Sequence, residues 1–167
     1  PMAVVGRSRA VGDGRSGIRN LNGEIFVTYA NQDAARKDDV HCPGCGLINV
    51  FDTSGNFLRR LTQRGNLNAP WGLTEFDGEL WVGNFGDGKI NVYDSTTGAF
   101  IETLMRADGM PLPFDGLWYL LTRGDGFYFT AGIADEEHGL FGLISVAESS
   151  GRCKLCVAQF LVLFQGC

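Results

Sequence analysis

Acidic side chains follow three strand-like runs of the sequence, and their chemistry would be that of oxygen ligands. Each run is followed by one Asp at a matching distance, namely Asp33, Asp87 and Asp135, and Glu136 and His138 come after the third. Converging carboxylates repel one another unless a cation, a proton or an Arg compensates them, and hard oxygen ligands suit Ca²⁺ or Mg²⁺. Two interpretations remain open: a cation site formed by these five residues, or turns in which each Asp accepts backbone N–H bonds.

Cysteine pairs offer a second kind of site. Cys42 and Cys45 form one Cys-x-x-Cys motif, Cys153 and Cys156 form another, and Cys167 is the last residue. Thiolates at this spacing bind Zn²⁺, whereas in an oxidising compartment such residues form disulfides. The sequence leaves three alternatives open: a four-cysteine zinc site, disulfides, or free thiols, with Cys167 left over in each.

The elements that must position these residues recur as three units between residues 17 and 146. Each unit opens with a short apolar start, which is Gly17-Ile18, Gly72-Leu73 or Gly116-Leu117. Each then has a turn that needs positive φ angles, which is Asn22-Gly23, Asp77-Gly78 or Asp125-Gly126. Such turns join antiparallel strands in hairpins. Each unit therefore begins with two paired strands.

Further strands follow in every unit. The second strands are expected at 24–30, 79–83 and 127–131, the third strands at 46–52, 89–94 and 140–146, and the fourth strands at 56–61 and 99–104. No pattern with a helical period competes with them. Four antiparallel strands per unit predict an all-β fold of three β-propeller blades.

Three blades are too few to close a ring, because propellers have ~4 to 8 blades. Either a second copy of the chain completes a six-bladed ring as a homodimer, or the chain is part of a longer propeller. We expect the blades to occupy residues 17–148. Residues 1–16 form a basic tail that we expect to be disordered. Residues 149–167 supply either a last strand at 157–164 or a linker left from cloning.

Charge and hydropathy exclude two classes of partner. The net charge is −5, and because basic residues gather at both ends, the middle of the chain is more acidic than the whole. An acidic surface repels phosphate backbones, so we expect no binding of nucleic acid. No apolar run reaches the ~18 to 20 residues of a membrane-spanning helix, so we expect no membrane span.

Three segments carry a resemblance to a known family: APWGLT at 69–74, LWVGNFGDGKINVYD at 80–94 and FTAGIADEEHGLFG at 129–142. They resemble an uncharacterised family of secreted bacterial proteins that is related to NHL-repeat propellers. The resemblance implies the C-terminal half of a six-bladed propeller in an extracellular or periplasmic protein whose biochemical role is unassigned. The chain departs from that family at HCPGCG, residues 41–46, where the family lacks cysteines.

The function that these observations favour is a binding or scaffold module, with an unknown ligand and with cation binding on the face that carries the connections between second and third strands. A metal on that face could also polarise a carbonyl while Glu136 or His138 acts as base, as in propeller lactonases. A metal-dependent hydrolase is therefore one alternative, and an inactive structural fragment is another. Ca²⁺ or Zn²⁺ would be the cofactor of such sites.

Overall fold

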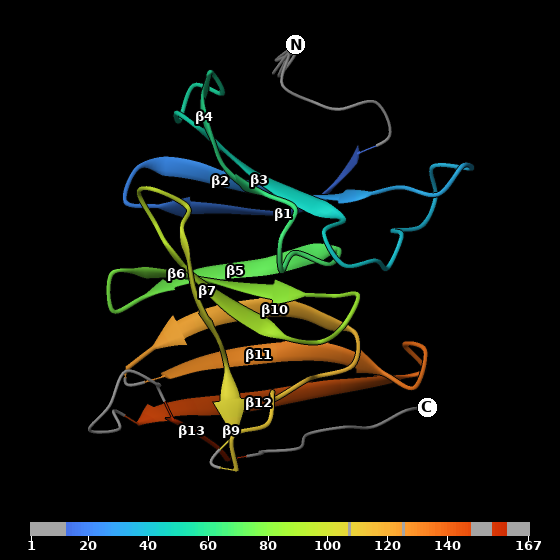
Figure 1. Ribbon diagram of the computed structural model, residues 1–167, viewed down its shortest axis with the longest axis vertical. Coiled ribbons are helices and arrows are strands. Elements are labelled where there is room, and N and C mark those ends of the chain that lie inside the picture. The colour runs from blue at the N-terminus through green and yellow to red at the C-terminus, as the bar shows by residue number, and fades with distance from the viewer. Residues whose placement is uncertain (1–12, 107, 125, 148–154, 160–167) are drawn as a thin grey trace.

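The structure is a computed structural model that describes residues 13–106, 108–124, 126–147 and 155–159. These residues form strands and no helix, and the strands make three sheets stacked one on another (Figure 1). The prediction of an all-β fold of three four-stranded antiparallel blades is confirmed. Among the described residues there is accordingly no helix that could span a membrane.

The four antiparallel strands of each sheet run in chain order, and we name the sheets the first, second and third blade. The first blade contains β1 (Asp13–Leu21), β2 (Glu24–Asn31), β3 (Gly46–Phe51) and β4 (Phe57–Gln63). The second contains β5 (Pro70–Phe76), β6 (Glu79–Asn84), β7 (Ile90–Asp94) and β8 (Phe100–Thr103). The third contains β10 (Leu117–Arg123), β11 (Gly126–Ile133), β12 (His138–Ala147) and β13 (Leu155–Gln159), with the short parallel strand β9 (Met105–Arg106) beside β13.

The ends of the blade region differ from the expected boundaries. β1 begins at Asp13, so the first strand starts inside the segment that we expected to be a tail. β13 ends at Gln159, and it overlaps the expected last strand only at 157–159. The remaining residues of both terminal segments lie outside the described part of the chain.

Two of the three predicted hairpin turns adopt the expected backbone. Asn22 and Gly23 have φ angles of 51° and 88°, and Asp77 and Gly78 have φ angles of 54° and 75°. The third turn lies one residue earlier than predicted, because β10 ends at residue 123 and β11 begins at residue 126. Gly124, with φ of 61°, supplies its left-handed backbone.

Pairing from these turns shows which residues of the three blades are equivalent. Ile18 pairs with Val27 and Leu73 pairs with Val82, as expected for matching starts. In the third blade β10 begins at Leu117 as expected, but Leu120 takes the position equivalent to Ile18 and Leu73 and pairs with Phe129. The first strands of all three blades carry a β-bulge, so the difference does not come from the bulge in β10. It arises because Leu117 lies three residues farther from its hairpin turn than Ile18 and Leu73 lie from theirs.

Apolar side chains on alternate residues of the strands form a core on each side of the second blade. Leu80 and Val82 of β6 face the first blade, where they join a buried cluster with Ile48 and Val50. Trp81, between them in sequence, faces the third blade and lies 5.1 Å from the ring of Phe127. Because successive side chains of a strand point to opposite faces, one strand holds two neighbouring blades.

The connections between second and third strands lie on the same side of the stack as the segments that cross from blade to blade (Figure 1). Backbone hydrogen bonds join them: the Ala69 N–H donates to the Cys45 carbonyl at 3.1 Å, and the Phe85 N–H donates to the Ala69 carbonyl at 2.9 Å. Farther along, the Phe114 N–H donates to the Gly88 carbonyl at 2.9 Å. We name this side the connection face.

Candidate functional site

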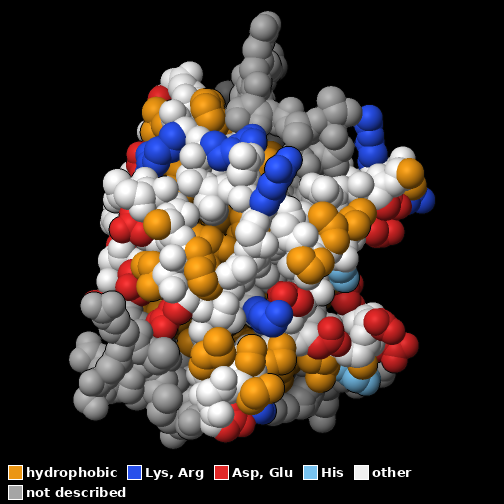
Figure 2. Space-filling view, in the orientation of Figure 1, with side chains coloured by type: hydrophobic (Ala, Val, Ile, Leu, Met, Phe, Trp, Pro, Cys, Tyr) orange, Lys and Arg blue, Asp and Glu red, His pale blue; other side chains and the backbone are white. Residues whose placement is uncertain are grey.

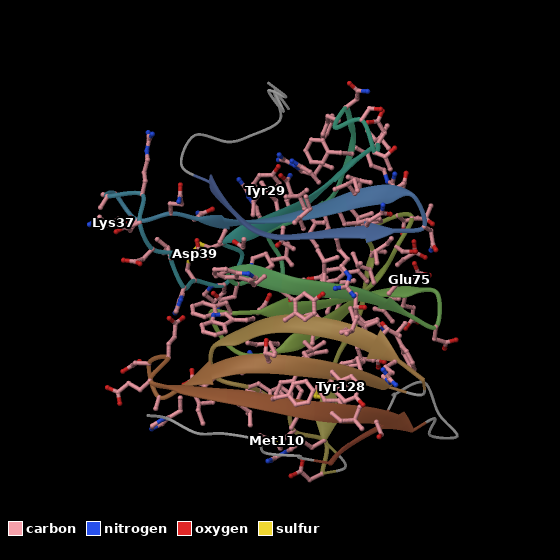
Figure 3. The ribbon with its side chains drawn as sticks, turned by 180° about the vertical axis from the view of Figure 1, so that it is seen from behind. Tyr29, Lys37, Asp39, Glu75, Met110 and Tyr128 are labelled. Atoms are coloured by element: carbon pink, nitrogen blue, oxygen red, sulfur yellow. A yellow bond between two sulfur atoms is a disulfide. The ribbon has the colours of Figure 1, made fainter. Side chains whose placement is uncertain are left out.

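Asp33 stabilises its own turn. Its Oδ1 accepts the backbone N–H of Lys37 at 2.9 Å, and its backbone carbonyl accepts the N–H of Arg36 at 3.0 Å. The connection that holds this turn also carries Asp39, whose backbone pairs with Gln32 (Figure 3). Asp33 therefore has the turn-capping role that the sequence left open as the alternative to a metal ligand.

Asp135 belongs to a tight turn at the other end of the connection face. It has φ of 53°, between Ala134 at 55° and Glu136 at 67°, and the Glu137 N–H donates to the Ala134 carbonyl at 3.1 Å. These residues and His138 are exposed, and acidic side chains gather with a His beside this connection (Figure 2). Within the described residues, however, no three His, Cys, Asp or Glu side chains gather as metal ligands.

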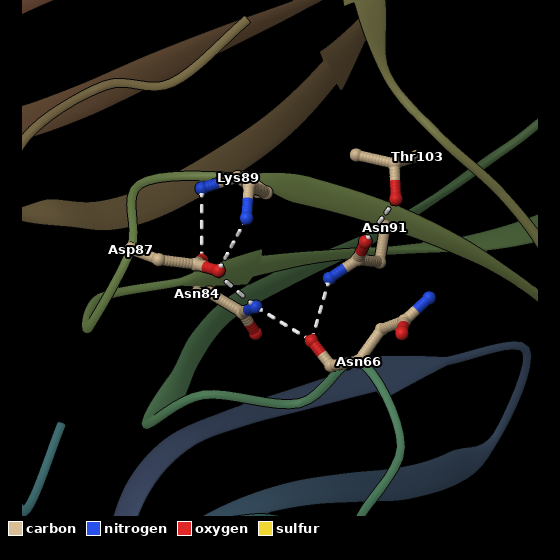
Figure 4. A network of polar contacts seen from close by, with 6 residues as sticks. All are labelled: Asn66, Asn84, Asp87, Lys89, Asn91 and Thr103. Carbon is tan, nitrogen blue, oxygen red and sulfur yellow. Dashed lines mark hydrogen bonds and ion pairs between the residues drawn. The ribbon is translucent and has the colours of Figure 1, made fainter. Parts of the chain in front are cut away.

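Asp87 lies in a network of polar side chains, unlike the other two predicted Asp residues (Figure 4). Its Oδ1 accepts hydrogen bonds from the Asn84 Nδ2 at 3.0 Å and from the Lys89 backbone N–H at 3.2 Å. Its Oδ2 forms an ion pair with the Lys89 Nζ at 3.1 Å. The charge of this carboxylate is thus compensated by an ammonium group.

Two buried side-chain amides, those of Asn84 and Asn91, extend the network into the second blade. The backbone carbonyl of Asn66, in the crossing from β4 to β5, accepts the Asn84 Nδ2 at 2.8 Å and the Asn91 Nδ2 at 3.0 Å. The Oδ1 of Asn91 accepts the hydroxyl of Thr103 at 2.7 Å. Asn84 is fully buried and Asn91 is 1% exposed, so these bonds fix the orientation of both amides.

A pocket of about 260 Å³ lies against this network. Polar side chains from three segments form one part of its wall, and apolar side chains form another. The polar residues are Asn66, Asn68, Asp87, Lys89, Asn91 and Thr103, and the apolar residues are Pro43, Met105 and Pro111. We name this cavity the polar pocket.

Two buried amide oxygens lack a hydrogen-bond partner among the described residues, one on a residue that lines the polar pocket and one on a residue of the network beside it. They are the Oδ1 of Asn68, which lines the pocket, and the Oδ1 of Asn84, which is bonded through its nitrogen to Asp87 and Asn66. Leaving a buried acceptor unsatisfied costs about 1 to 3 kcal/mol. Each oxygen can therefore accept a hydrogen bond from a donor other than the residues that the structure describes.

The first blade has a pair of residues equivalent to Asn91 and Thr103. Asn49 pairs with Arg60 in the first blade, just as Asn91 pairs with Thr103 in the second. The Arg60 Nε donates to the Asn49 Oδ1 at 3.1 Å. Arg and Thr thus meet the same Asn oxygen, but the short Thr103 side chain occupies far less space. Of these two equivalent residues, Thr103 lines the polar pocket.

Sequence reasoning identified Asp87 but missed the amides around it. A signal was present, because the third strands read Ile48-Asn49-Val50 and Ile90-Asn91-Val92, with a polar residue inside a buried apolar run. Buried polar groups are hydrogen-bonded and each calls for an explanation. The contribution of Asn66 had no such signal, because its backbone carbonyl is the group that acts.

The cysteines that the structure describes are Cys42, Cys45 and Cys156, and they lie in different parts of the fold. Cys42 and Cys45 form a disulfide, with their Cα atoms 5.3 Å apart, in the connection between β2 and β3. Cys156 belongs to β13 in the third blade, beyond the second blade (Figure 1), and Cys153 lies outside the described residues. Within the described residues, Cys42 and Cys45 are thus bonded to each other, which leaves neither of them as a free thiolate for zinc.

Comparisons with known proteins give sequence relatives without an assigned role. No protein-family model matches the chain. The chain is 35% identical over 140 residues, 77% of its length, to an uncharacterized protein of Acanthamoeba polyphaga mimivirus, and 33% identical over 142 residues to a second one. It covers 37% and 35% of these two proteins, so it spans about a third of their length. The secreted bacterial family of the sequence resemblance is not among these relatives.

Solved structures show the fold. The chain resembles the glutaminyl cyclase of Myxococcus xanthus with a TM-score of 0.52 at 13% identity, over 80% of this chain and 49% of that one. A GH43 β-xylosidase/α-arabinofuranosidase from a compost microbial metagenome gives a TM-score of 0.46 at 11% identity, over 84% of this chain and 54% of that one. The glutaminyl cyclase has a propeller fold. The chain is a set of three propeller blades with a polar pocket on the connection face.

Proposed function

We propose that this chain is a binding module of a β-propeller and that the polar pocket takes a small, uncharged, hydroxyl-rich ligand such as a monosaccharide or another polyol. The observation that carries the proposal is the buried, unpartnered amide oxygen of Asn68, a residue that lines a cavity of about 260 Å³. A ligand hydroxyl, or a water that the ligand holds in place, would donate to it.

The charges at the pocket favour a neutral ligand. Asp87 and Lys89 compensate each other across 3.1 Å, so neither a cation nor an anion finds an uncompensated partner there. A hydroxyl group both donates and accepts, which suits a wall that has amide, carboxylate and ammonium groups. Pro43, Met105 and Pro111 would pack against the C–H face of a ring, as ligand sites combine apolar walls with a few oriented polar groups.

The geometry supports binding better than hydrolysis. A metal-dependent hydrolase needs several ligands that converge on one ion, and the described residues hold no group of three His, Cys, Asp or Glu that could do so. Asp135, Glu136 and His138 are exposed on a turn, while Asp87 is bonded to Lys89. Binding of a ligand, unlike metal-dependent hydrolysis, requires only the polar side chains of the pocket, which hydrogen bonds and an ion pair already orient.

Thr103→Arg tests the proposal, because it gives the second blade the residue that the first blade has at this position. The arginine can bond to Asn91 as Arg60 bonds to Asn49, so the blade should fold while the pocket is filled. Monosaccharides and polyols are screened at millimolar concentration by saturation-transfer NMR. We expect binding by the native chain and by Leu58→Arg, an exposed control on β4, and a loss of affinity of about tenfold or more in Thr103→Arg.

Two results would overturn the proposal. One is equal affinity of the native chain and Thr103→Arg for the same sugar, because binding would then lie elsewhere. The other is the absence of binding by every member of the panel.

We also propose that further blades of the same kind complete the ring, as a second copy or as the rest of a longer chain. Ile25 and Phe51, on the side of the first blade that faces away from the second, line a hollow of about 500 Å³ with Val27. Their equivalents in the second blade, Leu80 and Tyr93, pack against the preceding blade. The same positions on the first blade are thus suited to receive another blade.

An extracytoplasmic location is a further proposal. Its support is the disulfide between Cys42 and Cys45, since disulfides form and persist in oxidising compartments. We also propose that the chain is related to NHL-repeat proteins. The support is the resemblance of the three segments 69–74, 80–94 and 129–142.

A further inference from the structure

The disulfide between Cys42 and Cys45 closes a small loop that forms part of the wall of the polar pocket. Pro43, between the two cysteines, lines the pocket. Gly44 has φ of 80°, and its N–H donates to the Leu67 carbonyl at 2.7 Å. The disulfide therefore holds both a wall residue and a backbone donor in place.

The loop is bonded in turn to the crossing that carries the pocket amides. The Ala69 N–H donates to the Cys45 carbonyl at 3.1 Å, and Cys45 pairs as a parallel bridge with Asn68. Asn68 lines the pocket, and the carbonyl of Asn66 in the same crossing accepts both Asn84 and Asn91. A short path of covalent and hydrogen bonds thus runs from the disulfide to the buried amides.

The crossing itself has backbone conformations that need such support. Arg64, Gly65 and Ala69 have φ angles of 64°, 55° and 45°, in the left-handed region. For residues other than glycine that region costs free energy and persists only when surrounding contacts impose it. The bonds from Gly44 and Cys45 are among the contacts that fix Leu67 and Ala69.

We propose that the Cys42–Cys45 disulfide is a redox latch for the polar pocket. Reduction by an external dithiol breaks the S–S bond and forms two thiols on the protein, while the dithiol gives up two electrons and two protons and becomes a disulfide. Both cysteines are partly exposed, and exposed disulfides are the more readily reduced ones. Once the bond is open, Pro43 and Gly44 regain conformational freedom, so the crossing loses support and the pocket loses its shape.

The consequence for binding rests on the proposed function. A ligand that needs the ordered pocket binds the oxidised protein more tightly than the reduced protein. By linkage, the same ligand then favours the oxidised state by the same factor and makes the disulfide harder to reduce.

The experiment has one readout that needs no ligand. Cys153, Cys156 and Cys167 are replaced by serine, and peptide mapping establishes the Cys42–Cys45 bond. Amide hydrogen exchange is then measured in oxidised protein, in protein reduced with dithiothreitol and in Cys42→Ser/Cys45→Ser. We expect faster exchange at Gly44 and Ala69 in the last two forms and unchanged exchange at Trp81 and Val92, which lie in the core of the second blade. Equal exchange at Gly44 and Ala69 in all forms overturns the latch.

The second readout is affinity for whichever sugar of the panel the native chain binds best. We expect reduction to weaken it by about fivefold or more, the lower end of common coupling factors, and Cys42→Ser/Cys45→Ser to match the reduced protein. Equal affinity of the oxidised and reduced forms contradicts the control of binding. If no sugar binds either form, the proposed function fails, while the exchange measurement still decides whether the disulfide controls the crossing.

Discussion

At the scale of single residues, chemically identical side chains have different roles because their neighbours differ. Asp33 accepts a backbone N–H within its turn, Asp135 is an exposed turn residue, and Asp87 is bonded to Lys89 and Asn84. The spacing of the three carboxylates was visible in the sequence. Their partners were not, since the groups that define the pocket around Asp87 come from the crossing and from two other strands.

Asp39 gives a prediction about pH. Burial raises the pKa of its carboxyl above the ordinary value of 3.8, with a smaller opposing effect from the Ser16 hydroxyl and contributions from His41 and Asp38. A raised pKa means that the folded state prefers the protonated form, so this stabilisation is present below pH 3.8 and is lost as the pH rises through the raised value. At neutral pH the ionised carboxylate is therefore destabilising.

Asp39→Asn should consequently raise the melting temperature at pH 7 and leave it nearly unchanged at pH 3, because the amide carries no charge and can still accept the Ser16 hydroxyl. Thermal unfolding at the two pH values measures this. Asp135→Asn, which removes the same charge from an exposed turn, is the matched control and should have little effect. If the melting temperature of Asp39→Asn at pH 7 is not higher than that of the native chain, the ionised Asp39 carboxylate is not destabilising.

At the scale of elements, the innermost strands of neighbouring blades approach so closely that one position must be glycine. A Cβ added to Gly17 of β1 would lie 2.0 Å from the Trp71 carbonyl oxygen of β5 and 2.9 Å from the Thr28 Oγ1. The Thr28 hydroxyl lies between the two strands, since it accepts the Gly17 N–H at 2.7 Å and donates to the Trp71 carbonyl at 3.0 Å. The close contact between the first two blades thus depends on glycine at position 17, which has no Cβ.

Gly17→Ala is expected to destabilise the chain by about 1 to 3 kcal/mol, the usual cost of overpacking, because a backbone carbonyl must move to make room. Urea unfolding followed by tryptophan fluorescence measures the change. Gly139→Ala on β12 is the control, since a Cβ there meets no atom within 4 Å, and it should stay within about 0.5 kcal/mol of the native chain. Equal stability of the two variants would show that β1 and β5 can separate without cost.

At the scale of the whole molecule, equivalent residues form the two interfaces between blades. The first and third blades have residues at the same positions on their outward sides. Trp81 of the second blade packs against the third, and Tyr128 has the same place, counted from the hairpin turn, in the third blade. Tyr128 stacks on Phe141 with ring centroids 5.3 Å apart (Figure 3). A bulky face at one end and a hollow at the other are the complementary halves of one more interface.

Two copies of the chain are therefore expected to join head to tail into a six-bladed ring, which gives closed twofold symmetry. Light scattering after size-exclusion chromatography should give twice the mass of the chain, 18.1 kDa. Tyr128→Glu should reduce the mass to that of one copy, while Leu58→Arg on β4 should leave it unchanged. A native chain that remains monomeric at high concentration would rule out this form of ring closure and leave completion by a longer chain.

The sequence by itself determined the strands, their antiparallel order and two of the three hairpin turns, because alternating side chains and Asn-Gly or Asp-Gly turns act over a few neighbouring residues. It did not determine which residue of β10 is equivalent to Ile18 and Leu73, because the third hairpin turn lies one residue earlier than the Asp-Gly pattern indicates. Only the tertiary structure decided the partner of Cys42 and the existence of the polar pocket. The pocket forms where a backbone carbonyl of one crossing meets the side chains of Asn84 and Asn91. Such contacts depend on how separate blades stack. The local sequence does not determine which residues of different segments come together in this way.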